Sequence, residues 1–173
     1  MKNIIFNLSL ILSLLCTLNC TAQNYHRQDP NADKFAGTWK WGSHINGLTL
    51  IMKKENDVQL LENGNDIFDL IIGFHKIYKN GVVTEDTTIF QDTNFIDKKR
   101  SIKGITDNNN PNLLVVFMPH KNKNIEMKIV YVDPTHLKII EVGNIEGVRL
   151  ILPSQTAPSS AIDIPNNIIL TKQ

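Results

Sequence analysis

The sequence predicts an all-β protein, a single antiparallel up-and-down β-barrel of about 8–10 strands. Apolar and polar residues alternate along most of the chain, as they do in strands with one buried face. Turn residues recur about every ten positions, which is typical of barrels and sandwiches, and helical spacing of apolar residues is nearly absent. We find neither an internal repeat nor a second domain in the 173 residues.

The first two expected strands are DKFAGTWKW, which ends at Trp41, and GLTLIMKK, which follows it. Because side chains alternate between the two faces of a strand, each of these segments has one apolar face. These faces consist of Phe35, Gly37, Trp39 and Trp41 in the first strand and of Leu48, Leu50 and Met52 in the second.

A long hairpin is predicted around Asn80-Gly81, since this dipeptide accepts the positive φ angles of a type I′ turn. On its first arm, five side chains share a face that we expect to line the barrel interior: Phe68, Leu70, Ile72, Phe74 and Tyr78. Gly73 on the opposite face predicts a bend or a close approach of strands. Counting back from the turn pairs His75 with Asp86 and leaves Glu85 nearby, which we interpret as packing worth about 0.2–1 kcal/mol.

Six further strands complete the predicted barrel. They are RSIKGIT, LLVVFM, IEMKIVYV, HLKIIEV, GVRLIL and NNIILTKQ, with the Pro- and Ser-rich loop PSQTAPSSAIDIP before the last. LLVVFM is apolar on both faces, which indicates either a central strand covered twice or one wall of a cavity.

Residues 1–22 have the layout of a secretory signal peptide, with Lys2 ahead of an uncharged apolar run. Two forms of processing remain open. Cleavage after Ala22 leaves Gln23 at the new N-terminus. Alternatively, the leader ends before Cys20, which then carries a lipid anchor, and CTAQ resembles the corresponding segment of many Gram-negative envelope lipoproteins. We expect an exported protein that is periplasmic, secreted or an outer-membrane lipoprotein, with a short exposed segment at 23–33 before the barrel domain at 34–173.

The charge balance excludes nucleic-acid binding as an expected function. The chain has 18 basic and 17 acidic residues, and loss of Lys2 with the leader leaves 17 of each. The one basic cluster, DKKR at 97–100, is interpreted as a solvated turn, whereas backbone binding requires a clustered basic surface. Cys16 and Cys20 are the only cysteines, so the exported domain is expected to be stable without a disulfide and to contact a membrane only through a lipid on Cys20.

Gly37-Thr38-Trp39 on the first strand resembles the Gly-x-Trp signature of lipocalins and their calycin relatives. The resemblance implies that Trp39 closes one end of an eight-stranded barrel and packs on a basic side chain near the end of the last strand. Arg149 and Lys172 are the candidates, and we favour Arg149 because a planar guanidinium stacks well on an indole. The chain departs from lipocalins in having no obvious helix after the last strand.

A wider resemblance covers most of the exported chain. KFAGTWKW, GFHKIYKNGVVTEDTT and the terminal LTK together resemble a family of uncharacterised, lipocalin-like exported proteins of Gram-negative bacteria. This resemblance implies a fold and a compartment but no activity.

No catalytic, cofactor or metal site is predicted from motifs. The five histidines are scattered singly, without the spacing of metal ligands, although His44 and His75 could meet inside a barrel. The sequence contains no G-x-S-x-G, S-x-x-K or phosphate-binding glycine loop. We therefore expect a protein that is not an enzyme.

Two functions remain as hypotheses. The first is a binding module that holds a small apolar or amphipathic ligand in the barrel, lined by Trp41 and the five hairpin side chains above. The alternative is a non-catalytic structural or protein-interaction domain of the cell envelope with a filled core. Small barrels occur in both forms, so the contents of the interior decide between these hypotheses.

Overall fold

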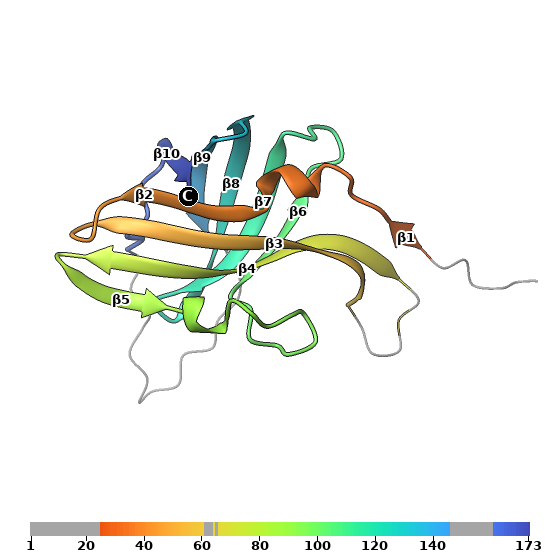
Figure 1. The fold of residues 1–173 in the computed structure, drawn as a ribbon, viewed down its shortest axis with the longest axis horizontal. Helices are drawn as coiled ribbons and strands as arrows, with labels where there is room; N and C mark the ends of the chain where they lie inside the picture. Colours follow the sequence, from red (N-terminus) through yellow and green to blue (C-terminus); the bar gives the residue numbers. More distant parts are fainter. Residues whose placement is uncertain (1–24, 61–63, 65, 146–160) are drawn as a thin grey trace, which may run out of the picture.

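The computed structural model describes residues 25–60, 64, 66–145 and 161–173. In this part of the chain, eight antiparallel strands close into a barrel, as predicted (Figure 1). The elements are β1 (His26–Arg27), η1 (Ala32–Phe35), β2 (Gly37–Gly42), β3 (Gly47–Gln59), β4 (Ile67–Lys79), β5 (Val82–Asp86), η2 (Thr88–Phe90), β6 (Ile102–Thr106), β7 (Leu113–His120), β8 (Lys123–Asp133), β9 (His136–Asn144) and β10 (Ile168–Lys172). Both η elements are short 3-10 helices.

The strands follow one another around the ring in chain order, so the predicted up-and-down arrangement is confirmed. The order is β2, β3, β4, β6, β7, β8, β9 and β10, and pairing of β10 with β2 closes the ring. β1 and β5 lie outside this ring and pair with β4. The predicted strand GVRLIL falls outside the described residues.

β4 changes its partner along its length. Ile71 to Gly73 pair with β6, whereas Lys76 to Lys79 pair with β5. A Cβ atom at Gly73 would lie 2.4 Å from the backbone oxygen of Ile51 on β3. The close strand approach predicted at Gly73 is therefore confirmed.

We expect Gly73→Ala to lower the free energy of unfolding by about 1–3 kcal/mol, because the β3 backbone must move to admit the methyl group. Urea unfolding measures this change. Gly143→Ala is the matched control, since Gly143 also lies in a strand and a Cβ there meets nothing within 4 Å. Equal losses in the two variants would contradict the steric argument.

Side chains fill the barrel interior. The largest buried cluster draws on all eight strands of the ring and includes Trp39, Leu48, Ile71, Ile102, Leu114, Ile125, Leu137 and Leu170, each at most 2% exposed. Such packing supplies the hydrophobic stabilisation of the fold. The interior thus matches the filled core of the alternative hypothesis.

Trp39 lies at the junction where the ring closes. Its Nε1 donates a hydrogen bond to the Phe35 backbone oxygen at 2.8 Å, and Lys172 Nζ lies 5.2 Å from its ring centroid. A Cβ at Gly37 would lie 2.8 Å from Lys172 Cε, so this glycine makes room for the lysine. Among the described residues, the basic side chain that packs on Trp39 is Lys172. Arg149, the candidate that we favoured from the sequence, lies outside the described residues.

The N-terminal part of the domain differs from the prediction in two ways. Phe35 belongs to the 3-10 helix η1 rather than to the first strand, because Ala36 N–H bonds back to Asp33 O. The segment 23–33 is not uniformly exposed, since Asp29 and Ala32 are buried. Asp29 N donates to a carboxylate oxygen of Asp69 at 3.1 Å and so ties this segment to β4.

The prediction of which face of β4 lies inside the barrel is wrong. Leu48 and Leu50 on β3 point into the core and pair with Ile77 and His75, and directly opposed residues share a face. The inner face of β4 therefore carries Ile71, His75 and Ile77. The five residues that we expected inside lie on the outer face: Phe68, Leu70, Ile72, Phe74 and Tyr78. β4 is apolar on both faces, so alternation alone could not identify the inner one.

Candidate functional site

A second apolar cluster lies on the outer face of β3 and β4. Val58, Leu70 and Ile72 are buried in it, and Phe68 and Phe95 pack against it. Three of the predicted ligand residues thus meet in one place, but outside the barrel. Phe95 belongs to the segment between η2 and β6, which folds back over the outer face.

Next to this cluster is a cleft of about 810 Å³, which we call the outer cleft. It lies between the end of β3 and the segment that follows η2. The course of both segments can be followed in Figure 1. Its lining combines apolar and charged side chains: Glu55, Asn56, Asp57, Val58, Gln59, Leu60, Phe95, Ile96, Lys98 and Arg100. Ligand sites are commonly clefts of roughly 300–1,000 Å³ with apolar walls and a few polar groups.

Side chains from β3 hold the far wall of the outer cleft in place. Lys53 Nζ donates to the backbone oxygens of Gln91 and Thr93, at 2.8 and 2.5 Å. Both carboxylate oxygens of Glu55 accept from Phe95 N at 3.1 Å. The outer face of β3 therefore fixes the position of a segment about 40 residues further along the chain.

Arg100 is the unusual group of the outer cleft. Its guanidinium carbon lies 3.5 Å from the Phe95 ring centroid, and Nη1 donates to Phe95 O at 2.6 Å. Its Nε is buried without a hydrogen-bond partner. Burial lowers the pKa of Arg100 below its ordinary value, and Glu55 partly offsets this. The predicted solvated turn at 97–100 thus ends in a half-buried arginine.

The remaining predicted ligand residues lie elsewhere. Phe74 is fully buried on the outer face, with Lys53 Nζ 5.6 Å from its ring centroid. Trp41 and Tyr78 line a separate hollow of about 220 Å³ near the turn after β2, together with His44. The six residues proposed from the sequence therefore do not form one site.

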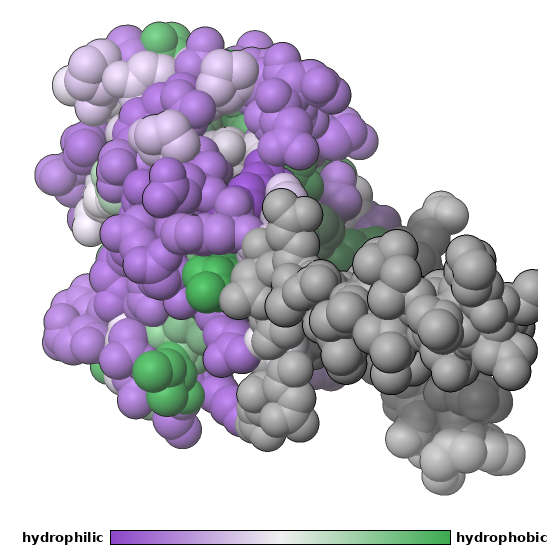
Figure 2. Space-filling view, turned by 90° about the vertical axis from the view of Figure 1, so that its right-hand side faces the viewer, coloured by the Kyte–Doolittle hydropathy of each residue, from purple (hydrophilic) through white to green (hydrophobic). Residues whose placement is uncertain are grey.

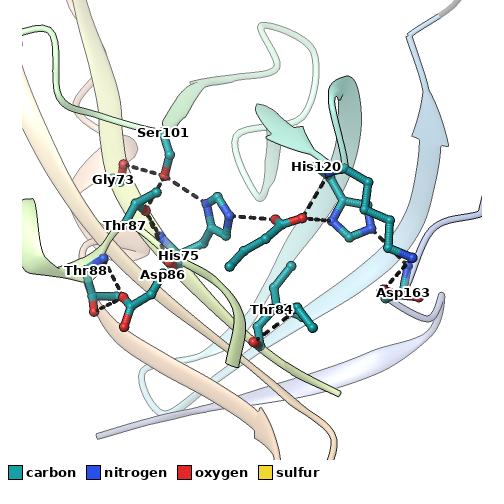
Figure 3. A network of polar contacts seen from close by, with 12 residues as sticks. Gly73, His75, Thr84, Asp86, Thr87, Thr88, Ser101, His120 and Asp163 are labelled. Atoms are coloured by element: carbon teal, nitrogen blue, oxygen red, sulfur yellow. Dashed lines mark hydrogen bonds and ion pairs between the residues drawn. The ribbon is translucent and has the colours of Figure 1, made fainter. Parts of the chain in front are cut away.

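A second polar site includes His75 and His120, which Figure 3 labels, and Glu85 of β5 lies within 3.0 Å of both. Glu85 Oε2 lies 3.0 Å from His75 Nε2, and Oε1 lies 2.9 Å from His120 Nδ1. Lys121 N also donates to Oε1, at 3.0 Å. These residues border a cleft of about 510 Å³, and both imidazoles are at most 2% exposed. Glu85 thus links β4, β5 and the turn after β7.

The partners of Glu85 define its ionisation. Burial raises the pKa of Glu85, but hydrogen bonds from His120, His75 and the Lys121 N–H outweigh this and hold the pKa well below its ordinary value. Asp163 N donates to His120 Nε2 at 3.1 Å, so Nε2 is an acceptor and Nδ1 is the ring nitrogen that faces Glu85. The carboxylate is therefore the common acceptor of the network.

Sequence reasoning found only part of this network. Lys79 pairs with Val82 as predicted, but a register shift follows, so that Asp86 pairs with Lys76 and not with His75. The expected proximity of His75 and Glu85 is confirmed. No sequence pattern near Glu85 could predict its contact with His120, because His120 lies on another hairpin.

Ser101 extends the network at its other end. Its Oγ lies 2.9 Å from His75 Nδ1, so serine, histidine and glutamate follow one another as they do in nucleophilic relays. The same oxygen lies 2.8 Å from Thr87 Oγ1 and 3.4 Å from Gly73 O, and Ser101 is only 9% exposed. These contacts satisfy the hydrogen-bonding capacity of the Ser101 hydroxyl and give it a structural role in the barrel wall. The expectation that the chain is not an enzyme stays a prediction.

Within the described ranges, one group has the arrangement of possible metal ligands. Ligand atoms of His26, Asp57 and Asp69 lie within 4.8 Å of one another. Lys54 Nζ lies 3.7 Å from Asp69, and His26 Nε2 lies 2.9 Å from Asp57, so these charges already have partners. His44 and His75 do not belong to such a group.

Cys20, the predicted lipidation site, and the predicted leader at 1–22 lie outside the described residues. No helix in the described part of the chain is long and apolar enough to cross a membrane.

No curated protein and no solved structure matches the chain. The sequence matches a family profile over residues 1–173, and the chain belongs to this family, the family of unknown function DUF6705.

Proposed function

We propose that this protein is a binding module that holds a small amphipathic molecule in the outer cleft, on the outside of a filled barrel. The observation that carries this proposal is the combination of an 810 Å³ cleft and the apolar cluster beside it. Val58 and Phe95 belong to both, so an apolar part of a ligand would extend a cluster that the fold already builds.

The packed interior supports a site outside the barrel. Trp39, Leu50 and Met127 are at most 1% exposed in the core, and a ligand there would have to displace side chains packed from every strand of the ring. The outer cleft requires no such rearrangement. The proposal keeps the ligand class expected from the sequence and changes its place.

A docking surface for another protein is the second candidate, and the filled core favours it. Where no grey residues lie in front, Figure 2 shows a mainly hydrophilic face with small hydrophobic patches. Stable docking surfaces usually expose a larger contiguous apolar area. The uncovered part of this face therefore gives little support for docking, whereas the outer cleft supports the small-molecule function.

Export is part of the proposal and is tested by intact-mass measurement of the protein purified from its own cells. A mass that begins at Gln23 supports a soluble exported form, and a diacylated or triacylated Cys20 supports a lipoprotein. An intact leader at residues 1–22 would contradict export.

Binding of the neutral amphipathic probe N-phenyl-1-naphthylamine, followed by its fluorescence, tests the cleft. We expect the double variant Leu60→Asp, Ile96→Asp to weaken binding at least about tenfold, which is about 1.4 kcal/mol. Both side chains line the cleft and are exposed, at 48% and 82%, so the substitutions leave the core intact. The matched control is Ile89→Asp, Val132→Asp, at exposed apolar positions that do not line the cleft. No binding by the wild type, or equal weakening in both doubles, would overturn the proposal.

A further inference from the structure

We infer that Arg100 is an anion anchor and that the outer cleft takes an amphiphile with one carboxylate head group, such as a fatty acid of intermediate length. This inference rests on the proposed function and specifies its ligand. It concerns the guanidinium of Arg100, the one that the described residues contribute to the lining of the cleft.

Arg100 is a half-buried cation that lacks a direct ion-pair partner among the described residues. No carboxylate of the described residues forms an ion pair with it within 4.0 Å, and Nε has no hydrogen-bond partner. Within the described ranges, its hydrogen bond runs from Nη1 to Phe95 O. A guanidinium carries five N–H donors and binds carboxylates through two parallel hydrogen bonds. A buried charge that lacks a partner is costly, so an incoming carboxylate would remove an existing penalty.

The neighbouring acid is not available as that partner. Both oxygens of Glu55 accept from Phe95 N, and its charge only partly offsets the burial of Arg100. Phe95 therefore separates the two side chains: its N–H bonds to Glu55, and its carbonyl and ring contact Arg100. The fold thus holds Arg100 in place without neutralising it.

The charges in the lining favour a single negative charge on the ligand. Among the described lining residues, Glu55 and Asp57 contribute carboxylates, and Lys98 and Arg100 contribute cations. A dianionic head group such as a phosphate monoester would be repelled by the two carboxylates more strongly than a monoanion. The apolar cluster next to Arg100 would receive the hydrocarbon tail.

Arg100 also borders a second hollow, of about 450 Å³, which contains Lys103 and Phe117. An anion held there would contact Lys103 as well, and an anion in the outer cleft would not. Substitution of Lys103 therefore distinguishes the two positions.

The test is displacement of N-phenyl-1-naphthylamine by three ligands with the same tail: dodecanoate, dodecan-1-ol and dodecyl phosphate. For the wild type we expect dodecanoate to displace the probe at a concentration at least tenfold lower than either of the others. Arg100→Gln should lose this preference but still bind the probe, Arg100→Lys should keep part of it, and Lys103→Gln should keep it entirely. Circular dichroism confirms that each variant is folded.

The outcomes separate this inference from the proposed function. If the probe does not bind the wild type, the proposed function fails. If the probe binds but dodecan-1-ol or dodecyl phosphate competes as well as dodecanoate, only the carboxylate anchor is wrong. The role of Arg100 would also be overturned if Arg100→Gln kept the preference for dodecanoate, or if Lys103→Gln lost it. If Arg100→Gln does not fold, the comparison of the three ligands on the wild type and on Arg100→Lys still tests the carboxylate anchor.

Discussion

Trp39→Ala should lower the free energy of unfolding by about 3–5 kcal/mol, a large part of the 5–15 kcal/mol that stabilises an ordinary domain. The indole is fully buried, and its Nε1 donates to Phe35 O. It also lies where β10 pairs with β2, beneath the Lys172 side chain. The substitution therefore leaves a cavity at the closure of the ring. Urea unfolding followed by circular dichroism gives the measurement.

Trp41→Ala is the matched control for Trp39→Ala. Trp41 lies two residues further along β2 and is only partly buried against the same core. We expect it to cost less than half as much, because less area leaves water when its ring packs. Similar losses in the two variants would show that the ring of Trp39 has no special role in closing the barrel.

Glu85→Gln should destabilise the protein by about 3 kcal/mol at pH 7, since it removes a charge that lies against two buried imidazoles and the Lys121 N–H. The amide has one acceptor oxygen, and its NH₂ group would face an imidazole N–H of His75 or His120. Asp86→Asn is the control on the same strand. Its ion pair with Lys76 is about one quarter exposed, so we expect a loss of no more than about 1 kcal/mol.

The stability of the wild type should also depend on pH through Glu85. The pKa of Glu85 in the folded protein lies below the ordinary value of 4.5, so its contribution is fully present above pH 4.5 and is lost as the pH falls below it. The difference in unfolding free energy between wild type and Glu85→Gln should therefore shrink from pH 5 to pH 3. A constant difference over this range would show that the hydrogen bonds to the carboxylate do not stabilise its charge.

Local patterns predicted those features that depend on neighbouring residues. The turn at Asn80-Gly81 and the pairing of Lys79 with Val82 follow from backbone preferences at two positions. The apolar face of Trp39, Leu50 and Met52 follows from alternation where the opposite face is polar. The resemblance of Gly37-Thr38-Trp39 to the Gly-x-Trp signature predicted the basic side chain on Trp39, but not which candidate it would be.

The sites depend on contacts between distant segments, which no local pattern contains. Val58 and Phe95 meet because charged groups of β3 hold the segment after η2. His120 reaches Glu85 because the turn after β7 lies beside β5, where β4 has exchanged β6 for β5. The side chain of Arg100 looked like part of a solvated turn, and only its place on Phe95 shows it as a half-buried cation.

By itself, the sequence determined that this chain is a single all-β barrel with its strands in up-and-down order, because alternation and turn chemistry act over a few residues. Only the tertiary structure decided which face of β4 lies inside. That strand is apolar on both faces, and its inner face is set when the ring closes and Leu50 meets His75. With the ring closed, side chains pack the interior, and Leu70 and Ile72 lie on the outside, beside the cleft that we propose as the site.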